Sequence, residues 1–296
     1  MRDSNEYLVS VVVPNYNNQD YIEKCIKSIF DQSYTGVYEV IIVDDCSTDN
    51  SVRIIQDLMK VYSRLKLIPL KKNGGVSNAR NEGLFSVKTK YVTFIDSDDY
   101  YFNKEKLKNE MELIKKYRTK IGKEILSYSS VVKAQNDLSR YYFPPSNKKM
   151  YLQGNVEVNL LKGRKFKTIM RDYCLSTEIV RSVGGYNPNR NLYEDWELLL
   201  KLSSIVEFYC TFEYGTAYRV SINGLSQRPI SLLNKKKNEI FYEFLNSKNV
   251  WVRAEILLVK KLVDFNSSLK RKYYLFKKFV KGVLLKTGLY SINHNN

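Results

Sequence analysis

The sequence predicts an α/β fold with a mixed, mainly parallel sheet flanked by helices, and two features of its first hundred residues carry that prediction. Short β-branched runs alternate with segments whose apolar residues recur at helical spacing. The runs also lack the strict apolar and polar alternation of half-exposed strands, which is typical of parallel strands covered on both faces. Strands separated by helices in this order form βαβ units.

Most of this pattern lies before residue 100. Residues 9–13 read VSVVV and stop at Pro14, and residues 40–43 read VIIV and stop at Asp44 and Asp45. LKLIPL and YVTFI are two further predicted strands. The expected helices are at residues 21–30, from residue 51 onward, and at residues 76–85. Because ligands bind beyond the carboxyl ends of parallel strands, the polar residues after these strands are expected to share one edge.

After residue 101 the pattern is less regular. A charged helix is expected from residue 104 to about 118, followed by the strand-like run ILSYSSVV and a loop containing Pro144 and Pro145. YEDWELLLKL begins another helix near Tyr193, and from about residue 231 the chain is rich in lysine and helical in pattern. The expected parts are residues 1–100, residues 101–228, and a basic helical extension at residues 229–296.

The composition is that of a globular protein with a strong basic excess. The 296 residues are 44% hydrophobic and carry a net charge of +17. Residues 229–296 hold 14 lysines and arginines against 4 acidic residues, so more than half of the excess belongs to the C-terminal part. No apolar run approaches the roughly 18 residues of a membrane span. Four dispersed cysteines without a CxxC pair argue against a zinc site and a disulfide framework, and they fit a reducing cytoplasm.

Three carboxylates follow the predicted strand YVTFI. Asp96, Asp98 and Asp99 lie within four positions, and acids this close resist ionising together unless a cation or hydrogen-bond donors neutralise them. Oxygen ligands at this density suit Mg²⁺ or Mn²⁺, and such a cation commonly also holds a diphosphate. The alternative is an N-cap for the following helix, for which a single aspartate would suffice. We favour a cation site.

Polar loops also follow the other three predicted strands. DDCSTDNS begins with Asp44 and Asp45, and it is either a ligand contact or an acidic loop that caps the next helix. PNYNN offers the ring of Tyr16 for stacking on a base, although loop tyrosines more often pack within the protein. KKNGGVSNARNEG places a glycine pair before a helix that contains Arg80. Glycines there permit close backbone approach, and amides at a helix start favour an anion.

In order and spacing, these four segments resemble the nucleotide-sugar-binding half of family 2 glycosyltransferases, which have the Rossmann-like GT-A fold. The family signature runs VSVxxPxYN, IIVDDxSxD, NxGxxxARNxG and then a strand ending in a DxD motif, and residues 8 to about 100 match nearly every motif position. A looser likeness continues in DYCLSTEIVRSVGGYNPNRNLYEDWELLLKL, which resembles the acceptor half, and in AYRVSINGLSQR, which resembles the closing segment.

The resemblance implies a role for each matched residue of the donor half. Pro14 and Tyr16 would border the nucleotide base, with Tyr16 stacking on it. Asp45, with Asp44 as a second candidate, would bond the uracil edge. Arg80 would lie near the base and ribose and help to hold that acidic loop.

The resemblance also implies a cation bound by the acids after YVTFI. Asp98 would be the main ligand of Mn²⁺ or Mg²⁺, and Asp96 would contact the ribose or the metal. Many relatives have a histidine two residues after the arginine of the closing segment, where this chain has Ser221; its one histidine is His294. The identity of a third side-chain ligand is therefore open.

In the acceptor half the resemblance makes Asp195 the catalytic base, with Glu194 beside it contacting the acceptor or orienting the base. An acceptor hydroxyl would attack the anomeric carbon from the face opposite the diphosphate while a carboxylate takes its proton, with inversion. The competing interpretation is two first-turn acids that stabilise the helix dipole. The family context implies a UDP-sugar donor and a glycan or lipid-linked acceptor in bacterial surface polysaccharide synthesis: capsule, O-antigen or exopolysaccharide.

The basic C-terminal part contains an amphipathic segment. Residues 269–290, LKRKYYLFKKFVKGVLLKTGLY, place apolar residues on one helical face and lysines on another. This segment is either a solvated helix packed on its own domain or an interfacial helix on an anionic membrane leaflet. We expect a cytoplasmic protein, with peripheral attachment to the inner face of the cell membrane as the alternative to a fully soluble one.

Three other functions agree less well with the sequence. A nucleic-acid-binding protein is disfavoured because the acids cluster at strand ends and no DNA- or RNA-binding signature is present. A catalytically inactive sugar-nucleotide-binding or membrane-docking scaffold would not need the DSD and ED pairs that this chain keeps. A nucleotidyltransferase shares the nucleotide and metal requirements, but it would release pyrophosphate where a glycosyltransferase releases UDP.

Overall fold

The computed structural model describes residues 7–135, 138–144, 148, 151–161, 172–190, 192–220, 228–248, 252–253 and 256–257. The chain divides into two compact units, Met1–Ile240 and Phe241–Asn296. Every element that positions the site described below belongs to the first unit. Residues 269–290, Ser221 and His294 lie outside the described residues, so the expectations for them stay predictions. Among the helices of the described ranges, none is long and apolar enough to cross a membrane.

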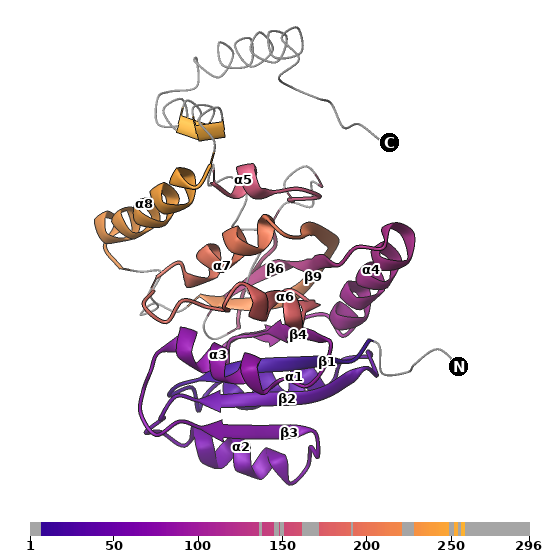
Figure 1. Cartoon of the computed structure of the whole chain (residues 1–296). Coiled ribbons are helices and arrows are strands. Elements are labelled where there is room, and N and C mark those ends of the chain that lie inside the picture. Colours follow the sequence, from indigo (N-terminus) through magenta and orange to yellow (C-terminus); the bar gives the residue numbers. More distant parts are fainter. Residues whose placement is uncertain are drawn as a thin grey trace, which may run out of the picture. The chain divides into compact units, whose positions relative to one another are not determined.

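The larger sheet has five strands in the order β3-β2-β1-β4-β8 (Figure 1). Its parallel members are β1 (Val9–Asn15), β2 (Val37–Asp44), β3 (Leu65–Pro69) and β4 (Tyr91–Phe94). The short β8 (Leu175–Ser176) is antiparallel to β4. β1 and β4 are buried at every position. Burial on both faces explains why their sequences do not alternate strictly between apolar and polar residues. The predicted α/β class and its mainly parallel sheet are confirmed.

Three helices connect the parallel strands: α1 (Ile22–Phe30), α2 (Ser51–Met59) and α3 (Val76–Ser86). The chain steps outward from β1 to β2 to β3 and then returns past β1 to β4. Because such crossovers are right-handed, α1 and α2 cover one face of the sheet and α3 covers the other. The reversal between β1 and β4 is a topological switch point, where open α/β sheets bind ligands.

A second sheet has the order β5-β9-β6-β7. Its strands are β5 (Tyr100–Tyr101), β6 (Ile125–Gln135), β7 (Tyr141–Tyr142) and β9 (Glu207–Val220). β6 and β9 form a long parallel pair, and α4 (Lys106–Ile121) packs against both. The remaining helices are α5 (Glu157–Leu161), α6 (Thr177–Ser182), α7 (Glu194–Ser203) and α8 (Ile230–Asn246). β9 was not predicted from the sequence, because its mixed aromatic and polar residues show no clear period.

One hydrophobic core joins β1, β2 and β4 to α1 and α4. The apolar face of α1 predicted from its spacing is buried: Ile22, Cys25, Ile26 and Ile29. The same cluster includes three side chains of α4: Leu107, Met111 and Ile114. Burying a side chain of this size stabilises the fold by about 1.5–3 kcal/mol. The helices are therefore held mainly by this packing.

Pro14 lies inside β1, whereas the sequence predicted that the strand stops there. β1 continues to Asn15 and pairs Pro14 with Val43 of β2. On the side of β1 that faces β4, the carbonyl of Val12 accepts the N–H of Ile95 at 3.1 Å. The pairing of β1 with β4 ends at Val12. Pro14 faces that same side two residues later, so its missing N–H removes no ladder bond. The last residues of β1 consequently reach the switch point.

Buried charges fix α4 against β6 and β9. Nζ of Lys106 donates to Glu110 at 2.9 Å and to the carbonyl of Asp172 at 2.8 Å. Ser129 on β6 donates to Glu110 at 2.6 Å, and Thr216 on β9 donates to the carboxylate of Asp172. Because removing one member of a buried ion pair is strongly destabilising, this network holds β9 firmly close to its carboxyl end.

Candidate active site

The three acids after β4 gather in one cluster. Carboxylate oxygens of Asp96, Asp98 and Asp99 all lie within 4.8 Å of one another. Asp96 and Asp98 are partly exposed, whereas Asp99 is buried. Burial, followed by the negative charges of Asp99, Asp98 and Asp96, raises the pKa of the nearby Cys25 thiol well above its usual value. Three carboxylates therefore gather at the switch point, close to the buried Cys25 side chain.

The end of β9 holds the loop that carries these acids. Oδ1 of Asp99 accepts the backbone N–H of Arg219 at 2.8 Å, and the carbonyl of Asp98 accepts Nε of Arg219 at 2.9 Å. The guanidinium of Arg219 lies over the ring of Tyr21, 4.4 Å from its centroid. Asp99 thus binds a strand of the second sheet, and it is not a cap of the next helix.

The donor set of the cluster fits a hard divalent cation. Carboxylate oxygens are the ligands that Mg²⁺ and Mn²⁺ prefer. Asp96 and Asp98 are the two acids that solvent reaches, whereas one oxygen of the buried Asp99 accepts a peptide N–H. Asp96 and Asp98 are therefore the residues best placed to hold a cation, and their role as metal ligands stays a prediction.

Asp44, the last residue of β2, and Asp45, which follows it, hold neighbouring loops in place. Asp45 accepts hydrogen bonds of 2.7 Å from the backbone N–H groups of both Gly74 and Gly75, and Asp44 accepts one of 2.7 Å from Nδ2 of Asn15. Gly75 has φ +83°, a conformation that favours glycine. The glycine amides expected to favour an anion thus bind a carboxylate of the chain itself. The uracil contact of Asp44 and Asp45 stays a prediction.

Tyr16 offers an exposed ring at the carboxyl end of β1. Its side chain is 46% exposed, and the loop that carries it is tied to the acidic loop after β2. The N–H of Asn17 donates to Oγ of Ser47 at 2.9 Å, and the N–H of Thr48 donates to Oδ1 of Asn17 at 2.8 Å. Pro14, the other expected neighbour of the base, is buried in β1.

Arg80 bridges the two halves of the chain. Its side chain is 1% exposed, and it donates through Nη2 to Oδ1 of Asp96 at 2.7 Å and through Nη1 to Oε1 of Glu194 at 2.9 Å. This bridge was not predicted from the sequence, because Glu194 lies 114 positions from Arg80. An arginine inside a helix, without a nearby acid at helical spacing, would have been the one available signal.

Other contacts of α3 strengthen the same junction. Nδ2 of Asn81 donates to the carbonyl of Tyr186 at 2.7 Å, and Oδ1 of Asn81 accepts the N–H of Tyr186 at 2.9 Å. Arg181 on α6 donates to the carbonyls of Leu84 at 2.8 Å and Val87 at 2.6 Å. The ARN motif and the GGY turn therefore contact each other directly, which positions the start of α7.

Glu194 and Asp195 occupy the first turn of α7, as predicted. Glu194 is buried, whereas Asp195 is partly exposed, and Oδ1 of Asp195 accepts the N–H of Trp196 at 2.7 Å. Burial, and then the charge of Asp195, raises the pKa of the Tyr193 hydroxyl. Of the two acids, Asp195 is the one that a bound substrate could reach.

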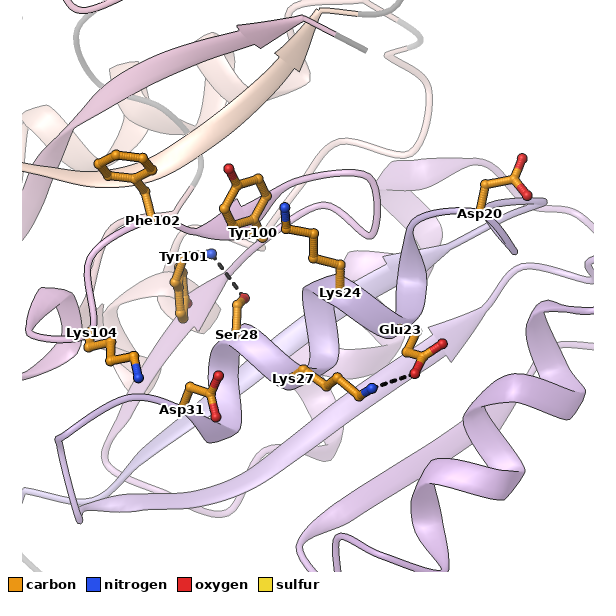
Figure 2. Close-up of a pocket in the computed structure, with 10 residues that line it drawn as sticks. All are labelled: Asp20, Glu23, Lys24, Lys27, Ser28, Asp31, Tyr100, Tyr101, Phe102 and Lys104. Carbon is orange, nitrogen blue, oxygen red and sulfur yellow. Dashed lines mark hydrogen bonds and ion pairs between the residues drawn. The ribbon is translucent and has the colours of Figure 1, made fainter. Parts of the chain in front are cut away.

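A recess of about 410 Å³ lies between α1 and β5, and Figure 2 shows its lining. Nζ of Lys24 stands 4.0 Å from the centroid of the Tyr100 ring. Burial, and then the charge of Arg219, lowers the pKa of Lys24. The lining comprises Asp20, Glu23, Lys24, Lys27, Ser28, Asp31, Tyr100, Tyr101, Phe102 and Lys104. These residues include none of the acids discussed above.

Comparison with solved structures identifies the fold. The crystal structure of S. aureus TarS 1–349 in complex with UDP superimposes with a TM-score of 0.66 at 23% identity, over 90% of this chain and 75% of that one. GalNAc-T7 with UDP, GalNAc and Mn²⁺ superimposes with a TM-score of 0.59 at 15% identity, over 75% of this chain and 45% of that one. The GT-A fold expected from the sequence is confirmed.

Sequence comparison identifies the family. The chain is 27% identical over 252 residues to the poly(ribitol-phosphate) beta-N-acetylglucosaminyltransferase TarP of Staphylococcus aureus, which is 78% of this chain and 76% of TarP. It spans only 30% to 51% of the length of three other curated bacterial glycosyltransferases that it matches. A model of the family described as Glycosyl transferase family 2 matches residues 10–168, more than half of the sequence. The chain therefore belongs to glycosyl transferase family 2.

Proposed function

We propose that this protein is an inverting, metal-dependent glycosyltransferase that transfers a sugar, a hexose or an N-acetylhexosamine, from a UDP-sugar to a carbohydrate acceptor. One observation carries the proposal: Arg80 brings the acid cluster after β4 next to the acidic first turn of α7. The first group has the ligands for a cation and the second offers an accessible carboxylate. A transferase that moves a sugar from a nucleotide needs both within one site.

We propose a UDP-sugar as the donor. TarS has been solved with UDP and with UDP-GlcNAc, and GalNAc-T7 with UDP. In this chain the exposed ring of Tyr16 would stack on the base, with Pro14 bordering it. Asp45, with Asp44 beside it, would recognise the uracil edge. The bonds between the Tyr16 loop and the acidic loop support a shared base-binding function.

Asp98 and Asp96 would hold Mn²⁺ or Mg²⁺. A cation there would stabilise the negative charge that gathers on the leaving diphosphate. GalNAc-T7 was solved with Mn²⁺, and the oxygen ligands of this cluster suit that ion. The ion pair with Arg80 partly neutralises the charge of Asp96. The three acids would therefore keep their positions whether or not a cation is bound.

Asp195 would act as the general base. As the acceptor oxygen attacks the anomeric carbon, its proton passes to the carboxylate of Asp195 and a new glycosidic bond forms. The bond from the anomeric carbon to the diphosphate oxygen breaks on the opposite face, and UDP leaves with the electron pair. Attack opposite the leaving group inverts the anomeric configuration. The partial exposure of Asp195 supports this assignment.

The acceptor is proposed to be a glycan or lipid-linked glycan of a bacterial surface polymer. TarP is named for its action on poly(ribitol-phosphate). A net charge of +17 suits an acidic acceptor of this kind. Attachment of residues 269–290 to an anionic membrane at the cytoplasmic face would bring the protein to a lipid-linked acceptor.

A panel of nucleotide sugars incubated with Mn²⁺ tests the proposal. At least one UDP-sugar is expected to be hydrolysed slowly to UDP, with loss of turnover on chelation and recovery on adding Mn²⁺ back. Release of pyrophosphate would indicate a nucleotidyltransferase. If no nucleotide sugar is bound or hydrolysed, the proposed function is wrong.

A further inference from the structure

The bridge made by Arg80 spans the two chemical ends of the candidate site. Asp96 belongs to the acid cluster after β4, and Glu194 is the first residue of α7. The two distances from the guanidinium, 2.7 Å to Asp96 and 2.9 Å to Glu194, are those of charge-assisted hydrogen bonds. One planar group therefore links the acid cluster of the donor half directly to the first turn of α7 in the acceptor half.

Burial and charge keep this group in place. One positive charge serves two carboxylates whose side chains are only 17% and 9% exposed, and losing one partner of a buried ion pair is strongly destabilising. The guanidinium also lies 5.0 Å from the centroid of the Tyr186 ring. Because its fork of donors is rigid, it cannot move toward one carboxylate without weakening its bond to the other.

The bridge reaches the candidate base through a single peptide bond. Asp195 follows Glu194 in the first turn of α7, and its Oδ1 accepts the N–H of Trp196. A shift of Glu194 would therefore move Asp195 as well. A general base must stand within hydrogen-bond reach of the proton it takes, and a misplacement of about 1 Å can lower the rate about 100-fold.

We propose that Arg80 is a positioning residue that couples the cation site to the catalytic base. By holding Asp96 and Glu194 together, it sets where Asp195 stands relative to the sugar donor. It also makes the geometry at Asp96 depend on Glu194. This inference rests on the proposed function and deepens it, because Arg80 acts through these two acids and not through the nucleotide.

Hydrolysis kinetics of variants test this role. Arg80→Met should lower kcat about 100-fold, with no rise in donor KM, because losing Arg80 leaves the carboxylate of Asp96 available to the cation. Arg80→Lys should lower it about tenfold, because an ammonium cannot bond both carboxylates in the fixed geometry of a guanidinium fork. The double variant Arg80→Met with Glu194→Gln should recover about fivefold over Arg80→Met alone, since it no longer buries an unpaired carboxylate.

Arg190 provides the matched control. It pairs with Glu197 of α7 at 2.6 Å and with Glu239 of α8 at 4.0 Å, and Glu197 keeps Lys201 at 3.3 Å as a partner. Arg190→Met therefore removes ion pairs of α7 without touching the bridge, and it should leave kcat nearly unchanged, because Glu197 keeps Lys201 and Asn187 as partners. Equal losses of kcat in Arg80→Met and Arg190→Met, at equal thermal stability, would reduce Arg80 to a structural role. A rise in donor KM at constant kcat, or no recovery in the double variant, would also overturn the inference.

UDP binding separates this inference from the proposed function. Calorimetry would compare the Mn²⁺-dependent affinity for UDP of the wild-type protein and of Glu194→Gln. Glu194 is not a proposed ligand, yet its loss would let Arg80 pair with Asp96 alone and should weaken that affinity about tenfold, or about 1.4 kcal/mol. Equal affinities would contradict the coupling. A wild-type protein that binds UDP with Mn²⁺ but hydrolyses no UDP-sugar would contradict the proposed function and still allow this comparison. No binding of UDP at all would contradict both.

Discussion

Asp99 and Arg219 join the acid cluster to the end of β9: Oδ1 of Asp99 accepts the backbone N–H of Arg219 at 2.8 Å. Asp99 is 6% exposed and Arg219 is 5% exposed, so water cannot easily replace this bond. The three neighbouring acids therefore have different tasks. Asp99 holds the loop, while Asp96 and Asp98 are the two acids of the cluster that solvent reaches.

Substitutions at Asp99 and Asp98 should separate these tasks. Asp99→Ala leaves a buried N–H without its acceptor, which should lower the free energy of unfolding by about 1–3 kcal/mol. Asp99→Asn keeps an acceptor oxygen and should cost less. Asp98→Ala should abolish Mn²⁺-dependent turnover with little loss of stability. Urea unfolding and UDP release measure the two effects, and an unstable Asp98→Ala with a stable Asp99→Ala would contradict the assignment.

Tyr16 should contribute to nucleotide affinity through its ring. Stacking of a base on an aromatic side chain is worth about 1–3 kcal/mol, so Tyr16→Ala should weaken UDP binding at least about fivefold, whereas Tyr16→Phe should bind almost as the wild type does. Tyr38 is the matched control because it is also 46% exposed and lies on β2. Titration calorimetry with UDP measures this. Equal losses for Tyr16→Ala and Tyr38→Ala would exclude a stacking role.

Gly83 allows α3 to approach the sheet. A Cβ at this position would lie 2.4 Å from Cγ1 of Val12 and 3.1 Å from Cγ2 of Val43. Gly83→Ala should therefore destabilise the fold by about 1–3 kcal/mol and reduce activity, since α3 carries Arg80. Adding Val12→Ala removes the nearest atoms, so the two losses of unfolding free energy should be less than additive. Full additivity in urea unfolding would show that this contact does not limit the packing.

Glu39 should make the fold sensitive to acid. Its side chain is buried, with an exposed fraction of 2%. Burial alone would raise the pKa of the Glu39 carboxyl group, but hydrogen bonds from Lys66, Ser10 and the N–H of Lys88 lower it by more, so the net pKa lies below the ordinary 4.5. A carboxyl group whose pKa is lowered by folding stabilises the protein at pH values above its ordinary pKa of 4.5. This stability is lost as the pH falls through the pKa of the folded protein. Unfolding free energies measured from pH 6 down to about pH 3 should therefore fall more steeply for the wild type than for Glu39→Gln. Parallel curves would contradict this role.

The donor half of the fold could be predicted from the sequence because its signals are local. The β-branched runs and the apolar spacing of α1 identify buried strands and a buried helix face without knowledge of their partners. The cluster of Asp96, Asp98 and Asp99 is likewise visible within four positions, and parallel strands bring their carboxyl ends together.

The contacts that complete the site could not be predicted in this way. Arg80 meets Glu194, and Asp99 meets Arg219, across more than a hundred positions. Such pairs depend on how the second sheet packs on the first. The predicted end of β1 at Pro14 was wrong for a related reason. A proline weakens a strand only where a neighbouring strand would accept the missing N–H, and the pairing of β4 with β1 ends at Val12, before Pro14.

The central claim is that Asp195 takes the acceptor proton at a UDP-sugar site built by the acids after β4. Single-turnover release of UDP from the best donor of the panel, with Mn²⁺ present, should be at least about 100-fold slower in Asp195→Asn than in the wild type. The affinity of the variant for UDP should stay within about twofold, because the proposed role of Asp195 is toward the acceptor and not toward the nucleotide. Wild-type turnover by Asp195→Asn, with UDP bound as tightly, would contradict the account.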